Sequence, residues 1–243
     1  MLAVLVGVLL VVVIRPPARW VTGALPPDVR CEAVSGSLWS GRCGRAWLTR
    51  AQAGPPVIVQ VEWRAVPSRL LQGRLTVQVR LARGGSVLEA EVRRGWGVTE
   101  VHTLRGLARL EDQLLPVIAA GWRGAARFEG LQLTLRGHQL VTARGELRLL
   151  QIRREGPPAV DYGDLLLRWP AAAPAGAVAA SVSDLGGPLQ VQATLLLAST
   201  GAWQLEGSVA PRGALAAELA AQLALLGPPD ANGRRSVAMA GQP

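Results

Sequence analysis

Lysine is absent from the 243-residue chain, so all 26 of its basic residues are arginine. This absence excludes P-loop ATPases, protein kinases and Schiff-base enzymes, because their chemistry needs a lysine side chain. Histidine is almost as scarce: only His102 and His138 occur, and neither lies near a cysteine pair or paired carboxylates. A histidine-rich metal site is therefore not expected. The composition predicts a protein without a cofactor or a metal ion.

Motifs that would indicate catalysis are also missing. The segment 36–41 superficially resembles a nucleophile elbow, but neither Ser37 nor Ser40 has a glycine both two residues before and two residues after it. Glu89 and Glu91 could serve acid–base chemistry, but a spacing of two on a strand is typical of a solvated strand face. We predict that the protein is not an enzyme.

Charge and hydropathy indicate a globular chain with apolar surfaces to cover. Hydrophobic residues make up 49% of the chain and charged residues 18%, and the mean hydropathy is +0.25. This composition excludes a disordered chain. It indicates that part of the chain is either linked to a membrane or deeply buried. The net charge of +9 is uneven, because residues 1–155 hold 22 Arg against 11 Asp and Glu, whereas residues 156–243 hold 4 against 6. The arginines are spread singly, which favours solvated strand faces; anionic lipid or an acidic protein is the alternative partner, and nucleic acid is not expected.

An apolar run covers residues 2–14 and ends at Arg15-Pro16-Pro17. As a helix it would be about 20 Å long, short of the roughly 30 Å hydrocarbon core of a bilayer. Three interpretations compete: a transmembrane anchor that extends to residue 21 with Trp20 at the interface, a cleaved secretory signal, and a buried helix. We favour the anchor, with residues 1–21 in the membrane. Residues 22–243 would then form one β-rich domain on the exported side of that membrane.

Cys31 and Cys43 are the only cysteines, and Gly36-Ser37 lies near the middle of the segment between them. A hairpin centred on this pair would place the two thiols directly opposite each other. A disulfide would close a loop of roughly 13 residues, contribute about 3 kcal/mol, and require an oxidising compartment such as the bacterial periplasm. Two buried free thiols are the alternative.

From Pro27 onwards the dominant pattern has period two, as in half-buried antiparallel strands. It begins with Val57, Val59, Val61 and Trp63, and it predicts a hairpin over residues 74–93 that turns at Gly84-Gly85. Further strands are predicted at residues 131–137, 145–152, 164–169, 189–197 and 203–209. The last two form a hairpin around residues 199–201.

Two segments have helical rather than strand periodicity. Residues 107–122 are expected to form a helix that Pro116 kinks or shortens, and residues 214–226 a helix that ends at Gly227-Pro228-Pro229. The Ala/Pro-rich residues 170–176 are a connector. The predicted fold is mainly β: an N-terminal transmembrane helix, then an antiparallel β-meander that forms a curved sheet, with one or two short packed helices.

Several short blocks of glycine and tryptophan, taken in order, resemble the type II secretion system protein N family. The blocks lie at residues 17–20, 34–42, 63–64 with 70–75, 185–189, 203–207 and 226–235. The positions that carry the resemblance are Gly36, Leu38, Trp39, Gly41, Trp63, Gly73, Gly186, Gly187, Gly227, Asp230 and Gly233. The cysteine pair is not part of it. We expect Trp39, Trp47, Trp63 and Trp203 to face the core, with an exposed docking role as the alternative.

The resemblance implies a single-pass protein of the bacterial inner membrane, whose periplasmic β-rich domain is an accessory part of the machine that exports folded proteins across the outer membrane. It implies other type II secretion envelope proteins as partners, and it supplies no catalytic residues. Our first hypothesis is a non-enzymatic scaffold that binds through a sheet edge or a strand face. The alternative, from the hydropathy and the basic N-terminal part, is a periplasmic lipid-handling protein that shields acyl chains on a curved apolar sheet.

Overall fold

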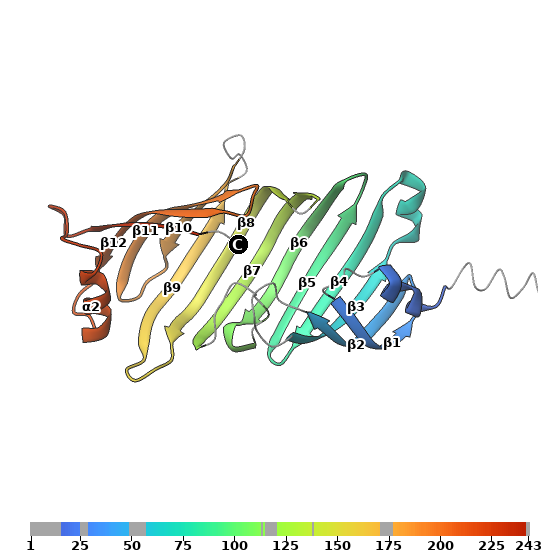
Figure 1. The fold of residues 1–243 in the computed structure, drawn as a ribbon, viewed down its shortest axis with the longest axis horizontal. Helices are drawn as coiled ribbons and strands as arrows, with labels where there is room; N and C mark the ends of the chain where they lie inside the picture. The colour runs from blue at the N-terminus through green and yellow to red at the C-terminus, as the bar shows by residue number, and fades with distance from the viewer. Residues whose placement is uncertain are drawn as a thin grey trace, which may run out of the picture.

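The computed structural model describes residues 16–24, 29–48, 57–112, 114, 121–137, 139–170 and 177–241. In this part of the chain a 13-stranded antiparallel sheet follows chain order from β1 to β13 (Figure 1). The strands are β1 (Val29–Gly36), β2 (Ser40–Leu48), β3 (Val57–Ala65), β4 (Leu75–Arg83), β5 (Ser86–Arg94), β6 (Val98–Arg109), β7 (Trp122–Arg136), β8 (Gln139–Arg154), β9 (Val160–Trp169), β10 (Ala177–Asp184), β11 (Leu189–Ala198), β12 (Trp203–Pro211) and β13 (Arg235–Gly241). The expected antiparallel meander is confirmed.

The predicted hairpins are present, but some strands were missed. β4 and β5 pair across the Gly84-Gly85 turn, and β11 and β12 pair across residues 199–202. β6, β10 and β13 were not predicted. β10 has the sequence AVAASVSD and β13 has RSVAMAG, so small residues occupy most positions on both of their faces. The contrast between apolar and polar positions, on which a period-two pattern depends, is therefore weak.

Short helices accompany the sheet: η1 (Ala18–Ala24), η2 (Pro67–Gln72), η3 (Leu110–Asp112) and α2 (Ala217–Ala224). α2 lies inside the predicted range 214–226 and buries Leu219 and Leu223 against one end of the sheet. The helix predicted for residues 107–122 is wrong at both ends. Residues 107–109 belong to β6, where pairing with β7 supplies their backbone hydrogen bonds, and Trp122 begins β7. Residues 115–120 and the connector 171–176 lie outside the described residues.

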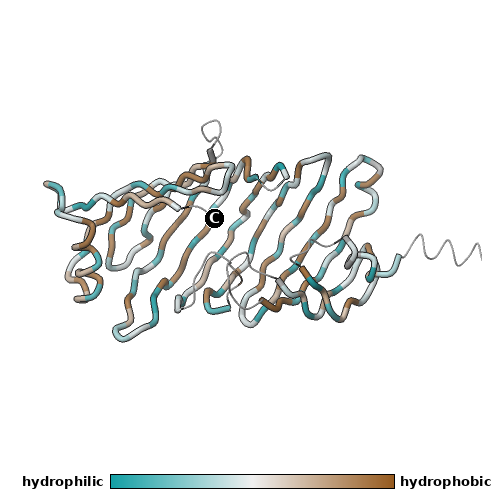
Figure 2. The backbone as a smooth tube through the Cα atoms, viewed as in Figure 1, coloured by the Kyte–Doolittle hydropathy of each residue, from teal (hydrophilic) through white to brown (hydrophobic). Residues whose placement is uncertain are grey.

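The two faces of the sheet differ sharply in polarity. One row of directly opposed residues crosses every strand and contains only apolar residues and glycine; we call it the apolar row. It consists of Val34, Cys43, Val61, Leu81, Leu88, Gly106, Phe128, Leu147, Leu167, Val182, Ala193, Gly207 and Val237. Most charged residues of the strands lie on the opposite face, so the colour alternates along the strands in Figure 2.

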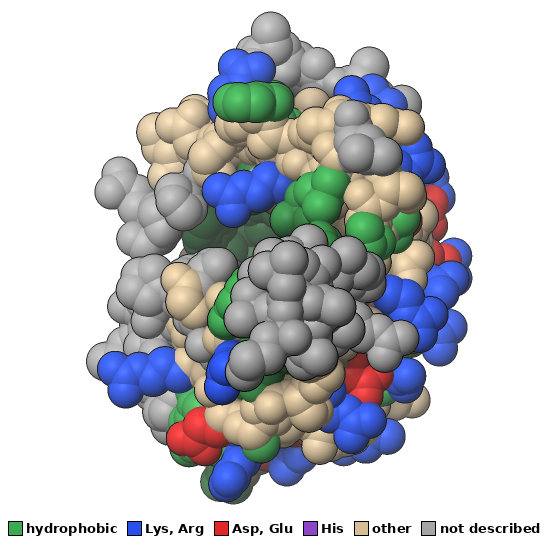
Figure 3. Space-filling view, turned by 90° about the vertical axis from the view of Figure 1, so that its right-hand side faces the viewer, with side chains coloured by type: hydrophobic (Ala, Val, Ile, Leu, Met, Phe, Trp, Pro, Cys, Tyr) green, Lys and Arg blue, Asp and Glu red, His purple; other side chains and the backbone are tan. Residues whose placement is uncertain are grey.

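The sheet is curved, with the apolar row on its hollow side. Figure 3 shows a hollow lined by hydrophobic side chains and an outer surface on the right where arginine and acidic side chains gather. We call these surfaces the concave face and the charged face. β-Bulges interrupt the register between β5 and β6, β6 and β7, β7 and β8, and β8 and β9. Bulges bend a strand and increase its twist, which accounts for part of the curvature.

The predicted anchor, residues 1–21, falls mostly outside the described residues. Within the described ranges, no helix has the length and apolar composition that crossing a bilayer requires. Trp20 belongs to η1 and is largely exposed. The anchor and the placement of residues 22–243 in the periplasm stay predictions.

Candidate functional site

The first family-like block builds a corner of the sheet. Gly36 has a φ of +96° at the β1–β2 turn, where a Cβ atom would lie 2.5 Å from the Ser40 carbonyl oxygen. Gly41 lies opposite Trp63, and its lack of a side chain makes room for the indole ring. The Trp63 Nε1 donates a hydrogen bond of 3.1 Å to the Leu38 carbonyl. These residues therefore lock the turn onto β3, which is a structural task.

Trp39 and Trp63 are half-buried, and Trp203 lies on the concave face opposite Leu197. Trp47 was expected to face the core, and this is wrong. It lies opposite Ile58 on the charged face, because a bulge between Cys43 and Ala46 shifts the alternation of β2 by one residue.

The remaining family-like positions lie in separate connections. Gly73 ends η2 with a φ of +69°. At the β10–β11 turn, a Cβ atom on Gly187 would lie 2.9 Å from the Cα of Gly163, so this turn packs directly on β9. After α2, the Asp230 side chain accepts hydrogen bonds of 2.8 Å from the backbone nitrogens of Asn232 and Arg234.

Two more family-like glycines belong to this last segment. The Gly227 carbonyl accepts a hydrogen bond of 2.9 Å from Arg235 Nε, and Gly233 has a φ of +75°. The family-like positions thus shape turns and are not gathered into one site.

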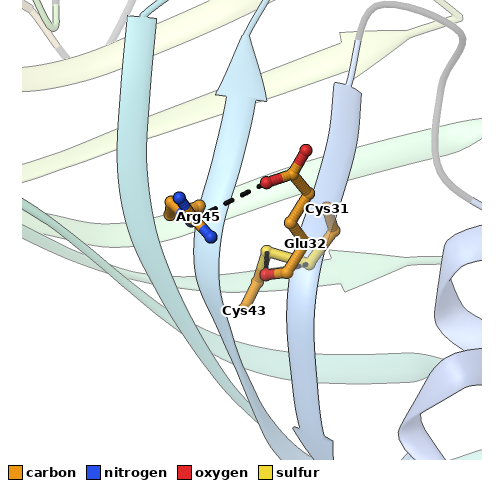
Figure 4. The surroundings of a disulfide bond; sticks show 4 residues. All are labelled: Cys31, Glu32, Cys43 and Arg45. Carbon is orange, nitrogen blue, oxygen red and sulfur yellow. Dashed lines mark hydrogen bonds and ion pairs between the residues drawn. A yellow bond between two sulfur atoms is a disulfide. The ribbon is translucent and has the colours of Figure 1, made fainter.

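Cys31 and Cys43 are joined by a disulfide between β1 and β2 (Figure 4). The thiols are not directly opposite, because the turn lies at residues 37–39 and Cys31 pairs with Ala46. Ala33 has a φ of +58°, an irregularity that helps to bring the Cα atoms of the two cysteines within 5.9 Å. Cys43 is buried against Val57 and Val59.

Replacing both Cys31 and Cys43 by alanine is expected to lower the free energy of unfolding by about 3 kcal/mol, since the crosslink restricts the unfolded chain. Urea unfolding with and without a reductant measures this. Reductant should lower the free energy of unfolding of the wild type nearly to that of the variant, and it should not change the value for the variant. A wild type that is insensitive to reductant would contradict a disulfide.

Alternating charges form a second row on the charged face, opposite in character to the apolar row. Its members are Arg42, Glu62, Arg80, Glu89 and Arg105, which lie directly opposite one another on β2 to β6. Their ion pairs have N–O distances of 3.1 to 3.8 Å. A depression of about 920 Å³ lies over these strands. Because the side chains are well exposed, each pair contributes at most about 1 kcal/mol.

This depression is a poor candidate for catalysis, because the charges that line it already neutralise one another. Glu89 contacts both Arg80 and Arg105, and Glu91 contacts Arg93 at 2.6 Å. Within the described part of the chain, no cluster of His, Cys, Asp and Glu is arranged to hold a metal ion.

Asp184 is the acidic group with the most structured surroundings. Burial alone would raise the pKa of this carboxyl, but its hydrogen bonds outweigh that effect and the pKa lies below its ordinary value. Its oxygens accept hydrogen bonds from the backbone nitrogens of Val191 at 2.9 Å and Gly186 at 3.3 Å, and from the Arg212 guanidinium at 2.5 Å. Asp184 thus fixes the β10–β11 turn.

Asp184→Asn is expected to lower the free energy of unfolding by about 1–3 kcal/mol near neutral pH. Because the folded pKa is depressed, this stability is fully present above the unfolded pKa of about 3.9 and is lost as the pH falls through the folded pKa. Urea unfolding across pH should therefore show the two proteins converging in acid. Glu206→Gln, at an exposed position on β12, is the control and should show a smaller difference. An equally large deficit of Asp184→Asn in acid would contradict this role.

Exposed arginines gather where β3–β4, β5–β6 and β7–β8 connect, at one end of the strands. We call this surface, made of Arg64, Arg69, Arg74, Arg94 and Arg136, the arginine rim. The connections touch: the Gly137 nitrogen donates to the Gly97 carbonyl at 3.3 Å, and Gly73 lies beside the Trp96 ring. Among the described residues, none of these arginines forms an ion pair. Trp96 is 96% exposed in their midst.

The sheet ends at β13, whose outer edge faces none of the other described strands. β13 pairs with β12 over its whole length without a bulge. Arg235 is its only charged residue, and Met239 is 53% exposed. An open edge of this kind can accept another strand.

Comparison with known proteins identifies the chain. The family model of type II secretion system protein N matches residues 27–238. The chain belongs to the type II secretion system protein N family. No match was found among curated proteins or among solved structures. The family makes this protein an accessory component of a type II secretion system, with a place in the cell envelope.

Sequence reasoning about this type II secretion protein missed the arginine rim and the β13 edge. The rim arginines are separated by up to about 70 residues and become neighbours only through strand pairing. The sequence feature that pointed to the rim was the excess of arginine in residues 1–155, but this excess does not show which arginines lie together. The sequence feature that could have predicted β13 was the apolar segment that follows the turn around Asp230.

Proposed function

We propose that this protein is a non-enzymatic scaffold of the type II secretion system, which binds a neighbouring envelope protein by adding a strand of that partner to β13. The family match supports the link to secretion. The observation that carries the binding mode is the open β13 edge at the end of an otherwise continuous sheet. Strand addition uses main-chain hydrogen bonds for affinity and alternate side chains for specificity.

β13 lacks the features that normally protect an edge. Edge strands avoid pairing through bulges, prolines and charged side chains. Val237, Ala238 and Met239 form a short, regular and uncharged stretch, and Met239 offers exposed apolar surface beside the edge. A partner strand would bury this surface while it satisfies backbone groups of β13.

The opposite edge, β1, is less open. η1 packs against β1, and the Leu38 nitrogen beyond its end donates a hydrogen bond of 2.8 Å to the Pro16 carbonyl. Pro17 also forms a bridge to Ser37. Residues 16–24 thus occupy space beside β1, whereas nothing in the described part of the chain does this for β13.

The scaffold is assigned to the periplasmic side of the inner membrane. The apolar run at residues 2–14 supports an anchor, and a disulfide supports an oxidising compartment. Proteins that meet it there include other envelope components of the secretion system.

Photo-crosslinking in native membranes tests this function. A benzophenone side chain placed at Ala238 or Met239 is expected to capture another secretion component, while the same group at the exposed Ile58, on interior strand β3, is not. Mass spectrometry identifies the captured protein. Ala238→Lys should weaken the capture from position 239, because a charged side chain blocks edge pairing. Lysine at this position faces Glu206, so folding should be retained.

The proposal fails if positions 238 and 239 capture no secretion component. It also fails if Ile58 captures the same protein equally well, since binding would then not be specific to the edge.

A further inference from the structure

We infer that the concave face and the arginine rim together bind an anionic phospholipid, with its acyl chains on the apolar row and its phosphate at the rim. This goes beyond the scaffold function and uses other residues, because β13 contributes only its row member Val237. Three observations carry the inference: the polarity of the row, its exposure, and the charge of the rim.

The apolar row runs along the whole sheet, and its accessible members offer a surface for hydrocarbon. Twelve spacings between 13 strands, at about 4.8 Å each, give the row a length of roughly 58 Å before curvature. One leaflet of a bilayer core is only about 15 Å thick, so the row exceeds the reach of an acyl chain in a membrane. No side chain in the row can donate or accept a hydrogen bond of ordinary strength, which suits hydrocarbon and does not suit a polar ligand.

The concave face is only partly covered by described residues. α2 packs on the end near β11 and β12, and Leu110 and Leu114 pack near the middle. Leu81, Leu147 and Leu167 of the row remain half-buried. Cys43, Leu88 and Phe128 of the row are buried in the core clusters, so the accessible part of the row lies at Leu81, Leu147 and Leu167. An apolar surface that stays accessible marks an interaction site.

The geometry favours an acyl chain over a polypeptide as the occupant. Backbone groups in the middle of the sheet are already paired with neighbouring strands. A peptide lying on the row would leave its own N–H and C=O groups without partners in an apolar hollow, which costs several kcal/mol for each pair. An acyl chain carries no such groups.

The arginine rim selects the head group. Arg94 lies opposite Leu75 on the concave face, so the rim reaches the hollow at this arginine. Figure 3 shows arginine side chains bordering the hollow. Guanidinium groups bind phosphate oxygens in a bidentate manner, and these arginines have no competing carboxylate among the described residues. Trp96 and the exposed Leu70 beside them are residue types that favour the boundary between head groups and acyl chains.

The test uses the full chain, purified in mild detergent and reconstituted into phosphatidylcholine vesicles with a trace of phosphatidylglycerol that carries a diazirine in its acyl chain. Illumination and mass spectrometry then locate the label. We expect the labelling to alternate along the strands. Leu147 and Leu167 should carry the label, and their neighbours Arg148 and Arg168 should not. Added unlabelled phosphatidylglycerol should compete, and added phosphatidylcholine should not.

Matched variants separate the rim from general charge. Replacing Arg69, Arg74 and Arg94 by glutamine should reduce labelling by at least about fivefold. Replacing Arg80, Arg105 and Arg168 on the charged face, which removes the same charge, should leave labelling unchanged. Trp96→Ala, at a side chain with almost no packing, should reduce labelling without affecting the fold.

Three results would overturn the inference: equal labelling of both faces, equal competition by phosphatidylcholine, or a benzophenone at Leu167 that captures a protein in place of lipid. Crosslinking from β13 is read out separately, so failure of lipid binding and failure of the scaffold function are distinguishable.

Discussion

Phe128→Ala is expected to lower the free energy of unfolding by about 3–5 kcal/mol, the largest effect of any single substitution considered. Phe128 is the only phenylalanine in the chain, and it is 8% exposed at the centre of the apolar row. It packs in one cluster with Leu131 of the same strand, Leu88 of β5 and Ile152 of β8. Alanine would leave a cavity that rigid strands cannot close.

Urea or thermal unfolding of the purified protein measures this loss. Val141→Ala on β8 is the matched control, because Val141 is 44% exposed and should cost less than about 1 kcal/mol. Equal losses for the two variants would contradict the placement of the core around β6 to β8.

Gly41→Val is expected to lower the free energy of unfolding by about 2–4 kcal/mol, because a steric clash and the loss of a hydrogen bond combine. A Cβ atom at this position would lie 2.4 Å from Cζ2 of Trp63 and 2.7 Å from the Ser35 carbonyl oxygen. The indole ring would have to leave β2, and its hydrogen bond to Leu38 would break with it. The carbonyl cannot move without disturbing the β1–β2 hairpin.

Gly95→Val is the control for Gly41→Val, since a Cβ atom built on Gly95 would have no heavy atom within 4 Å beyond its own residue and its two chain neighbours. Unfolding curves of both variants, together with the intrinsic fluorescence of the tryptophans, show whether Trp63 has been displaced. If Gly41→Val were as stable as Gly95→Val, the glycine would not be making room for the indole ring.

The steric role of Gly41, together with that of Gly36, also explains the family-like block that contains them. Short blocks of glycine and tryptophan are often taken as binding motifs, but here they form a hairpin turn and a docking place for one indole ring. Trp203 and Gly241 form a similar pair between β12 and β13 at the far end of the sheet. The block therefore serves the fold of this chain, and functional surfaces must be sought elsewhere.

The amino-acid sequence by itself determined the class of the fold and the family. Alternation of apolar and polar residues was strong enough to predict the hairpins at Gly84-Gly85 and at residues 199–201, because a period of two arises directly from the strand pleat. The spacing of leucines predicted α2, and the turn glycines carried the resemblance that the family match confirmed. These are local properties.

The tertiary structure alone decided which residues share a face. Each bulge shifts the alternation by one residue, so the side of the sheet reached by Trp47 depends on a bulge that the sequence does not announce. The apolar row depends on the register of every strand pair, and the arginine rim on three connections that pairing brings together. Such surfaces arise from contacts between residues far apart in the chain, and a local pattern carries no information about those contacts.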